Sequence, residues 1–130
     1  MNTLKGHITD IDAYKQLSLV KVNVNGITLT SIILNDGAYS PSIGEELNVL
    51  FKETEVTIGL DEDLHVSQQN QISGTIIKLE TGKLLSRLSI ESKAGEINAI
   101  ITSNAVSQLS LSIGLKVKAL IKTNELMLSN

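Results

Sequence analysis

Apolar and polar residues alternate along much of this chain, which is the pattern of β-strands with one face buried. The alternation runs through residues 17–24, stops at Asn25 and Gly26, and resumes over residues 27–33. An Asn-Gly pair suits the two positive-φ positions of a tight turn, so we expect the flanking strands to form a hairpin. A second hairpin is predicted from residues 84–90, 93–96 and 97–101.

A short segment after each predicted hairpin loses the alternation and favours a helix. In the second half of the chain, Ser103 or Asn104 is a suitable N-cap for a helix that ends near Leu109. In the first half, Asn35 would cap a helix, and Pro41 falls where that helix must end. With a further strand after each helix, the fold class is mainly β: two tandem small OB-like β-barrels, each of about five strands with one short helix.

The pattern repeats because the sequence is duplicated. Residues 4–8 return as residues 72–76, and residues 42–52 return as residues 112–122. The offset is 68 positions in the first case and 70 in the second, so the two copies differ by a two-residue insertion. A repeat of this kind predicts two units of the same fold.

The boundary between the copies is expected at an acidic stretch without a strand pattern. Residues 61–66 follow a predicted strand over residues 55–58 and have the character of a linker. We therefore expect a first barrel over residues 1–64 and a second barrel over residues 65–130. Units of this size with few aromatic residues gain stability by docking against a copy, so association is expected.

The composition limits where in the cell the protein is expected and which kinds of binding site it can contain. The 130 residues are 42% hydrophobic and 19% charged, enough to bury a core in one domain or in two small ones. There is no cysteine, which excludes disulfides and thiolate metal sites. No apolar run approaches the roughly 18 residues of a membrane-spanning helix, and no secretory segment precedes the first strand pattern. We expect a soluble cytoplasmic protein that does not bind a membrane.

Charge is unevenly divided between the copies, although the net charge is only −3. Residues 1–66 carry four basic and ten acidic residues, whereas residues 67–130 carry seven basic and four acidic residues. The second copy is therefore electropositive, which favours an anionic partner.

Several motifs resemble the molbindin family, whose units open with Ser-Ala-Arg-Asn-Gln and close with an Ile-Lys or Leu-Lys strand. The matching segments are residues 67–74, 99–102, 112–114 and 119–122, with a looser likeness over residues 3–60. The resemblance implies a tandem Mop/TOBE-type protein that binds molybdate or tungstate, with no organic cofactor, for intracellular molybdenum storage or homeostasis. It also implies that the ligands lie between units and subunits of a homo-oligomer, with a trimer favoured and a dimer as the alternative.

The chemistry of the ligand restricts the residues that can hold it. Molybdate is a tetrahedral dianion with four acceptor oxygens and no donors, so its site must offer converging N–H and O–H donors and a positive charge. Backbone amides at the start of the predicted helix meet this need, although a plain N-cap explains the same residues. The candidate donors of the second copy are Ser67, Gln69, Asn70, Thr102, Ser103, Lys122 and Thr123.

The first copy offers fewer donors. Leu34 stands at the place of Thr102, and Lys52 is followed by a glutamate where the lysine of the second copy is followed by a threonine. Asp36 brings a carboxylate that would repel a dianion. Thr3 with Lys52 is the best remaining pair, so we expect the first copy to bind more weakly.

Other functions fit the residues less well. Catalysis is not expected, because His7 and His65 have no motif partner. Single-stranded nucleic acid is not expected either, because two tyrosines, one phenylalanine and a pI of about 5.3 do not make a basic, aromatic-lined groove. Two alternatives stay open: the ligand-sensing domain of a molybdate-responsive transcription regulator, and an assembly module that binds no ligand.

Overall fold

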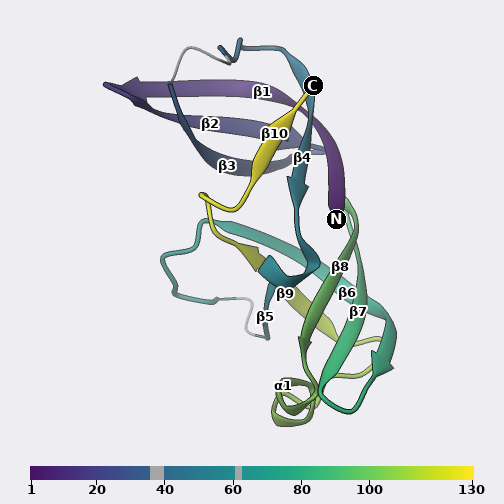
Figure 1. The fold of residues 1–130 in the computed structure, drawn as a ribbon. Helices are drawn as coiled ribbons and strands as arrows, with labels where there is room; N and C mark the ends of the chain where they lie inside the picture. The colour runs from purple at the N-terminus through teal and green to yellow at the C-terminus, as the bar shows by residue number, and fades with distance from the viewer. Residues whose placement is uncertain (36–39, 61–62) are drawn as a thin grey trace.

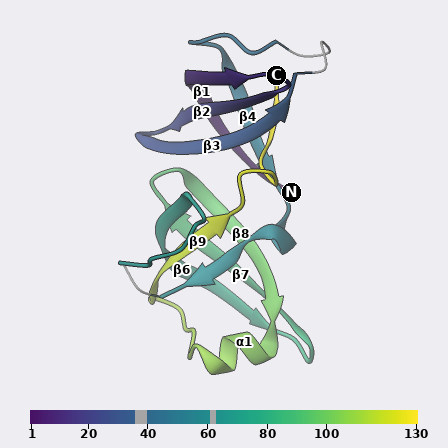
Figure 2. The ribbon, with the colours of Figure 1, turned by 90° about the vertical axis from the view of Figure 1, so that its left-hand side faces the viewer.

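Two curled five-stranded sheets stand end to end in the chain (Figure 1, Figure 2). The computed structural model describes residues 1–35, 40–60 and 63–130. The first sheet has the order β10-β4-β1-β2-β3, with bounds Met127–Ser129, Glu46–Phe51, Asn2–Tyr14, Leu17–Val24 and Ile27–Leu34. The second sheet has the order β5-β9-β6-β7-β8, with bounds Thr57–Gly59, Lys116–Ile121, Asn70–Thr81, Leu85–Ser92 and Gly95–Thr102. The prediction of a mainly β, tandem architecture is confirmed.

Both predicted hairpins are present. Asn25 and Gly26 adopt positive φ angles of 51° and 89°, and β2 pairs with β3 up to Val24 opposite Ile27. These are the backbone angles that a two-residue hairpin turn of type I′ requires. β7 and β8 form the second hairpin, whose last described pair is Ser92 opposite Gly95.

The long first strand of each copy contains an irregularity that helps to curl its sheet. Pairing of β1 with β2 shifts register between Ile8 and Asp10, and pairing of β6 with β7 shifts between Ile76 and Lys78. A β-bulge bends its strand and increases the local twist. Because the bulge stands at the same place in both copies, both sheets curl in the same way.

Gly6→Ala is expected to lower the free energy of unfolding by about 2 kcal/mol in urea denaturation. A Cβ atom at Gly6 would lie 2.5 Å from the carbonyl oxygen of Asn23 and 2.7 Å from a methyl group of Val22. Both distances are shorter than a normal contact, so β1 and β2 would have to separate. Lys5→Ala, at the exposed neighbouring position, is the matched control and should change stability by less than about 0.5 kcal/mol. Equal effects of the two substitutions would contradict the close approach of the strands.

The two copies exchange their last strands. β5 belongs to the first copy in sequence but pairs with β9 in the second sheet, whereas β10 belongs to the second copy and pairs with β4 in the first sheet. A 3-10 helix over Glu53–Glu55 marks the first crossing. The chain therefore reaches the second sheet before the predicted linker at residues 61–66. The division into units at residues 64 and 65 describes the repeat in the sequence, and as a boundary between domains it stays a prediction.

One hydrophobic core includes side chains of both copies. At the two crossings, Val56 and Leu126 belong to this core and are only 4% and 3% exposed. Phe51, at the end of β4, is fully buried in the same cluster. Because each copy completes the sheet and core of the other, we expect the two to unfold together.

The helix α1 spans Ser103–Gln108 and lies at the end of the second sheet that faces away from the first (Figure 1). Its N-cap is Thr102, whose side chain accepts a hydrogen bond from the Ala105 N–H at 3.1 Å. The prediction that Ser103 or Asn104 caps this helix is therefore wrong. Threonine, serine and asparagine all cap helices well, so the sequence alone does not choose among three such residues in a row.

The helix predicted after Asn35 falls on residues 36–39, outside the described residues. Asn35 itself and Pro41 have no regular secondary structure. Within residues 1–35, 40–60 and 63–130, no helix is long and apolar enough to cross a bilayer.

Candidate oxyanion site

Thr102 and Ser103 stand together at the start of α1, but their hydroxyl groups have different surroundings. Ser103 Oγ donates to the carbonyl of Gly82 at 2.7 Å and lies 2.8 Å from Ser86 Oγ. Ser103 thus ties the loop between β6 and β7 to the helix. Thr102 is exposed, and no described group accepts its hydroxyl proton. Thr102 is therefore the hydroxyl that can meet a ligand.

Asn70 begins β6 and lies in the junction between the two copies. Its side chain is only 1% exposed. Its Oδ1 accepts from the Thr30 N–H at 2.7 Å, and its Nδ2 donates to the Thr30 carbonyl at 2.9 Å. Asn70 thus joins the second copy to β3 of the first. Oxyanion binding by this side chain stays a prediction, and the contacts favour a positioning role.

Asn2, at the start of β1, makes the equivalent contact from the first copy to the second. Asn2 is 3% exposed, and its amide group bonds the N–H and the carbonyl of Asn98 in β8 at 2.8 Å each. Asn2 is not among the residues predicted from sequence. The signal was present, because Asn2 precedes Asn70 by 68 positions, the offset of the first repeated segment.

Lys122 and Thr123 follow β9 in a turn that is fixed to the first sheet. Within the turn, the Glu125 N–H donates to the Lys122 carbonyl at 3.0 Å. On its other side, the Ile32 N–H of β3 donates to the Thr123 carbonyl at 3.0 Å. The Lys122 side chain is exposed. A lysine on such a fixed backbone provides a compact positive charge suited to an oxyanion.

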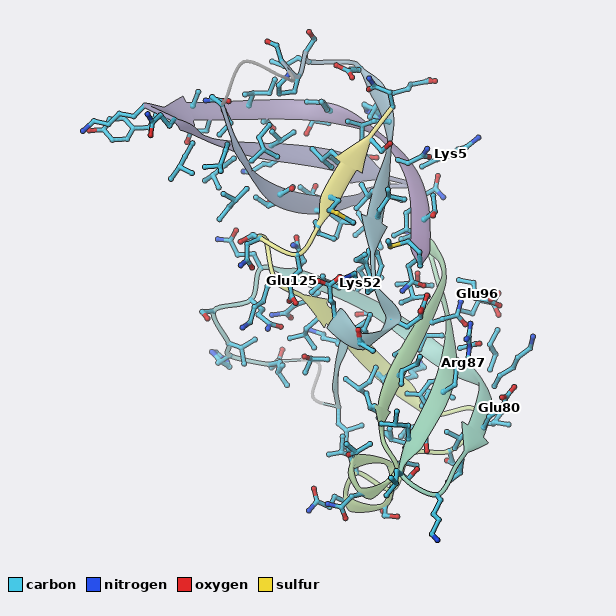
Figure 3. All side chains as sticks on the ribbon, viewed as in Figure 1. Lys5, Lys52, Glu80, Arg87, Glu96 and Glu125 are labelled. Carbon is cyan, nitrogen blue, oxygen red and sulfur yellow. The ribbon has the colours of Figure 1, made fainter. Side chains whose placement is uncertain are left out.

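Lys52 occupies the equivalent turn of the first copy, at the level where the two sheets meet (Figure 3). Its N–H donates to Glu55 Oε1 at 2.8 Å, and the neighbouring Glu53 carboxylate pairs with the N-terminal ammonium group of Met1. That hydrogen bond holds the pKa of Glu53 below its ordinary value, so the carboxylate is ionised at neutral pH. The Met1 ammonium group offsets the charge of Glu53, whereas the Glu55 carboxylate at the Lys52 N–H repels a dianion, which supports weaker binding by the first copy.

The two predicted donors of the first copy lie at the same end of its sheet, but they are not paired. Thr3 pairs with Leu50 across β1 and β4, and Lys52 lies two residues beyond Leu50, after the end of β4. Both side chains are exposed. This copy has no hydroxyl at the position of Thr102, which Leu34 occupies opposite Leu17.

The second sheet divides its predicted donors into two groups. Asn70 pairs with the last residue of β9, so residues 67–69 and Lys122 leave the sheet at the same end. Thr102 pairs with Leu85, next to the opposite end of β6. β6 has 12 residues, so on the order of 30 Å of strand separates the groups at about 3.3 Å per residue. A single chain therefore does not bring Thr102 and Lys122 together.

An apolar ladder lies on the outer face of β2 and β3. Leu17 pairs with Leu34 and Leu19 pairs with Ile32 across this hairpin, and Tyr14 pairs with Leu17 on β1. Their exposed fractions range from 36% to 74%. Contiguous apolar surface on a small protein marks a site of contact with another protein.

Comparison with known proteins identifies the repeated unit and its tandem arrangement. The TOBE domain model matches residues 66–128. The crystal structure of ModG, a cytoplasmic molybdate-binding protein with molybdate bound, is 25% identical and has a TM-score of 0.91, with 98% of this chain and 94% of that chain covered. A molybdate-binding protein from Sporomusa ovata is 30% identical over 45% of this chain and 88% of that chain, with a TM-score of 0.44. No curated protein matches the sequence.

The TOBE match covers the second copy, and the likeness to ModG extends over both copies. These matches agree with the repeat and with the motifs at the start and end of the second copy. The second copy therefore matches the TOBE domain, and the two copies together share the tandem fold of the molybdate-binding protein ModG, as the resemblance to the molbindin family predicts.

Proposed function

We propose that this chain binds molybdate or tungstate as a cytoplasmic storage or homeostasis protein and performs no chemistry on the ion. The observation that carries the proposal is the likeness in fold to ModG, a cytoplasmic protein with molybdate bound, over 98% of this chain. The electropositive second copy, with its exposed lysine and hydroxyl groups, supports it. Molybdate and tungstate have the same charge and shape, so the proposal covers both ions.

Each group of the proposed site has a definite role. Lys122 supplies a positive charge, and the hydroxyls of Thr123 and Thr102 donate to separate oxygens of the ion. Residues 67–69 contribute main-chain N–H groups and the side-chain donors of Ser67 and Gln69. Asn70 and Ser103 hold these groups in place, because their own side chains are hydrogen-bonded within the chain.

The site is completed between copies of the chain, because Thr102 and Lys122 lie at opposite ends of β6. Such a contact forms in a heterologous ring, and it also forms twice in a two-fold dimer, where each residue meets the other's counterpart in the partner. A trimer is proposed because the resemblance to the molbindin family implies it, and a dimer is the alternative. The apolar ladder supports association of the copies.

Mixed oligomers test this shared arrangement. Thr102→Ala and Lys122→Ala proteins should each bind molybdate weakly when pure, because each lacks one side of every site. When the two are coexpressed and assemble at random, about a quarter of the contacts join an intact Lys122 to an intact Thr102. Equilibrium dialysis should then recover about that fraction of the wild-type capacity. A mixture with no recovered capacity would contradict sites shared between protomers.

A further inference from the structure

The turns that close the two hairpins contact each other. Asn25 Nδ2, in the β2–β3 turn of the first copy, donates to the carbonyl of Lys93, in the β7–β8 turn of the second copy, at 3.2 Å. The two residues are counterparts in the repeat, because Lys93 follows Asn25 by 68 positions, the offset of the first repeated segment. This contact joins the two copies, and it depends on the side-chain amide of Asn25.

The β7–β8 turn is anchored within its own copy. Ser92 Oγ donates to the carbonyl of Gly95 at 2.7 Å and accepts from the Ala94 N–H at 3.1 Å. Ala94 is only 5% exposed and belongs to the shared core. Asn25 and Gly26 are both exposed. The side of the contact that solvent reaches is therefore the β2–β3 turn.

Asn25 is the one asparagine of the sequence that a glycine follows. In such a pair the main-chain nitrogen of the glycine can attack the side-chain carbonyl carbon of the asparagine, because glycine has no Cβ atom to obstruct the approach. The new C–N bond closes a succinimide ring, and the side-chain amide group takes up the displaced N–H proton and leaves as ammonia. Water then opens the ring at either carbonyl and gives aspartate or isoaspartate. The equivalent residues of the second copy, Lys93 and Ala94, lack the reacting side chain.

The folded turn engages both reacting groups in other contacts. The Gly26 N–H donates to Asn23 Oδ1 at 3.0 Å, so the attacking nitrogen keeps its proton and is directed at another side chain. The amide of Asn25 is directed at the Lys93 carbonyl. Both hydrogen bonds must break before the succinimide ring can close.

We propose that Asn25 is a site of covalent modification, at which spontaneous deamidation occurs only when the β2–β3 turn opens away from the β7–β8 turn. An exposed turn opens locally far more often than the whole chain unfolds. A reaction that is slow compared with opening and closing then follows the population of the open turn. The inference does not rest on the proposed function, because neither turn contains a proposed oxyanion donor.

The product cannot restore the contact between the turns. An ionised carboxylate accepts hydrogen bonds and donates none, so it does not bind the Lys93 carbonyl. Isoaspartate also lengthens the main chain of a two-residue turn, whose geometry depends on positive φ at both positions. Deamidation of Asn25 is therefore an irreversible loosening of the contact between the copies.

Peptide mass spectrometry of the full chain, incubated in mildly alkaline buffer with and without urea, tests the site and its protection by the fold. We expect aspartate and isoaspartate to accumulate at Asn25 before any other asparagine is converted. The rate at Asn25 in the folded chain should be about 5- to 100-fold lower than in urea, the range that two hydrogen bonds support.

Substitutions of Asn23 test the role of the bond to Gly26. Asn23→Ala frees the Gly26 N–H and should raise the rate in the folded chain about two- to tenfold, the range for one hydrogen bond. Asn23→Asp keeps an oxygen that accepts this N–H and should not raise the rate. Asn124→Ala, at an exposed position in another turn, is the matched control and should react like the wild type. In urea all these chains should react at the same rate, because the folded contacts are absent.

Asn25→Asp places one of the two products in the turn. The protection of the Gly26 N–H from hydrogen exchange should fall about two- to tenfold in this variant, because one hydrogen bond that holds the turn is lost.

The proposal would be overturned by equal rates at Asn25 in the folded and the urea-unfolded chain, or by conversion of another asparagine first in the folded chain. A wild-type rate in folded Asn23→Ala would overturn the protective role of the bond to Gly26. Unchanged protection of the Gly26 N–H in Asn25→Asp would contradict the loosening of the contact.

Discussion

Asn70→Ala is expected to lower the free energy of unfolding by about 2–4 kcal/mol, as measured by urea denaturation. The substitution removes the hydrogen bonds of 2.7 and 2.9 Å to the main chain of Thr30. It leaves a buried N–H and a buried carbonyl without partners, at a cost of about 1–3 kcal/mol each. Since these bonds join β6 to β3, the loss falls on the junction between the copies.

Asn124→Ala is the matched control, because Asn124 is exposed in a turn. Its expected effect is below about 0.5 kcal/mol. Asn2→Ala removes the equivalent contact with Asn98 and should cost about as much as Asn70→Ala. If the stability of Asn70→Ala matched that of Asn124→Ala, the junction would not depend on this side chain.

Lys122→Ala is expected to weaken molybdate binding at least tenfold, which corresponds to about 1.4 kcal/mol of binding free energy or more. Lys122 supplies the positive charge of the proposed site. Without it, the dianion would lose its hydration and gain no opposite charge in return, which is costly in free energy. The fold should be unaffected, because the side chain is exposed. Equilibrium dialysis measures the change.

Two further variants sharpen this prediction. Lys21→Ala removes an exposed lysine of β2 and should leave the affinity for molybdate unchanged. Lys122→Arg keeps the charge but replaces a compact ammonium with a planar guanidinium, so an intermediate affinity is expected. Wild-type affinity in Lys122→Ala would contradict the assignment of the site even if the chain binds molybdate.

Local patterns in the sequence predict most of the strands. Alternation over residues 17–24 and 27–33, with Asn25 and Gly26 between them, corresponds to the observed hairpin of β2 and β3. These features are local, because a turn type and a buried face depend on a few neighbouring residues. Because the sequence repeats, the strands predicted for one copy are also expected in the other.

The exchange of strands could not be predicted in the same way. The pattern over residues 55–58 predicts a strand, but it does not say which strand lies beside it. The pairing with β9 is decided by contacts more than 50 residues away in sequence. Hydrophobic burial is non-directional, so sequence pattern alone does not distinguish a strand that stays in its own copy from one that crosses.

For the candidate site, the sequence predicts which donor groups are present but not how the fold groups them. Lys122 and Thr102 are exposed, as a ligand site requires, but they belong to opposite ends of the sheet. The amide of Asn70 suits an oxyanion and a main-chain contact equally well, and only its burial distinguishes the two roles. The sequence shows which hydrogen-bond donors are present. Which of them lie close together depends on the register of β6 with its neighbouring strands.

Calorimetric titration of the full chain with molybdate, tungstate and sulfate tests the central claim most directly. We expect saturable heat with molybdate and with tungstate at concentrations up to the high micromolar range, and sulfate serves as the comparison ion of equal charge and smaller size. Absence of heat with both molybdate and tungstate in that range would contradict the account.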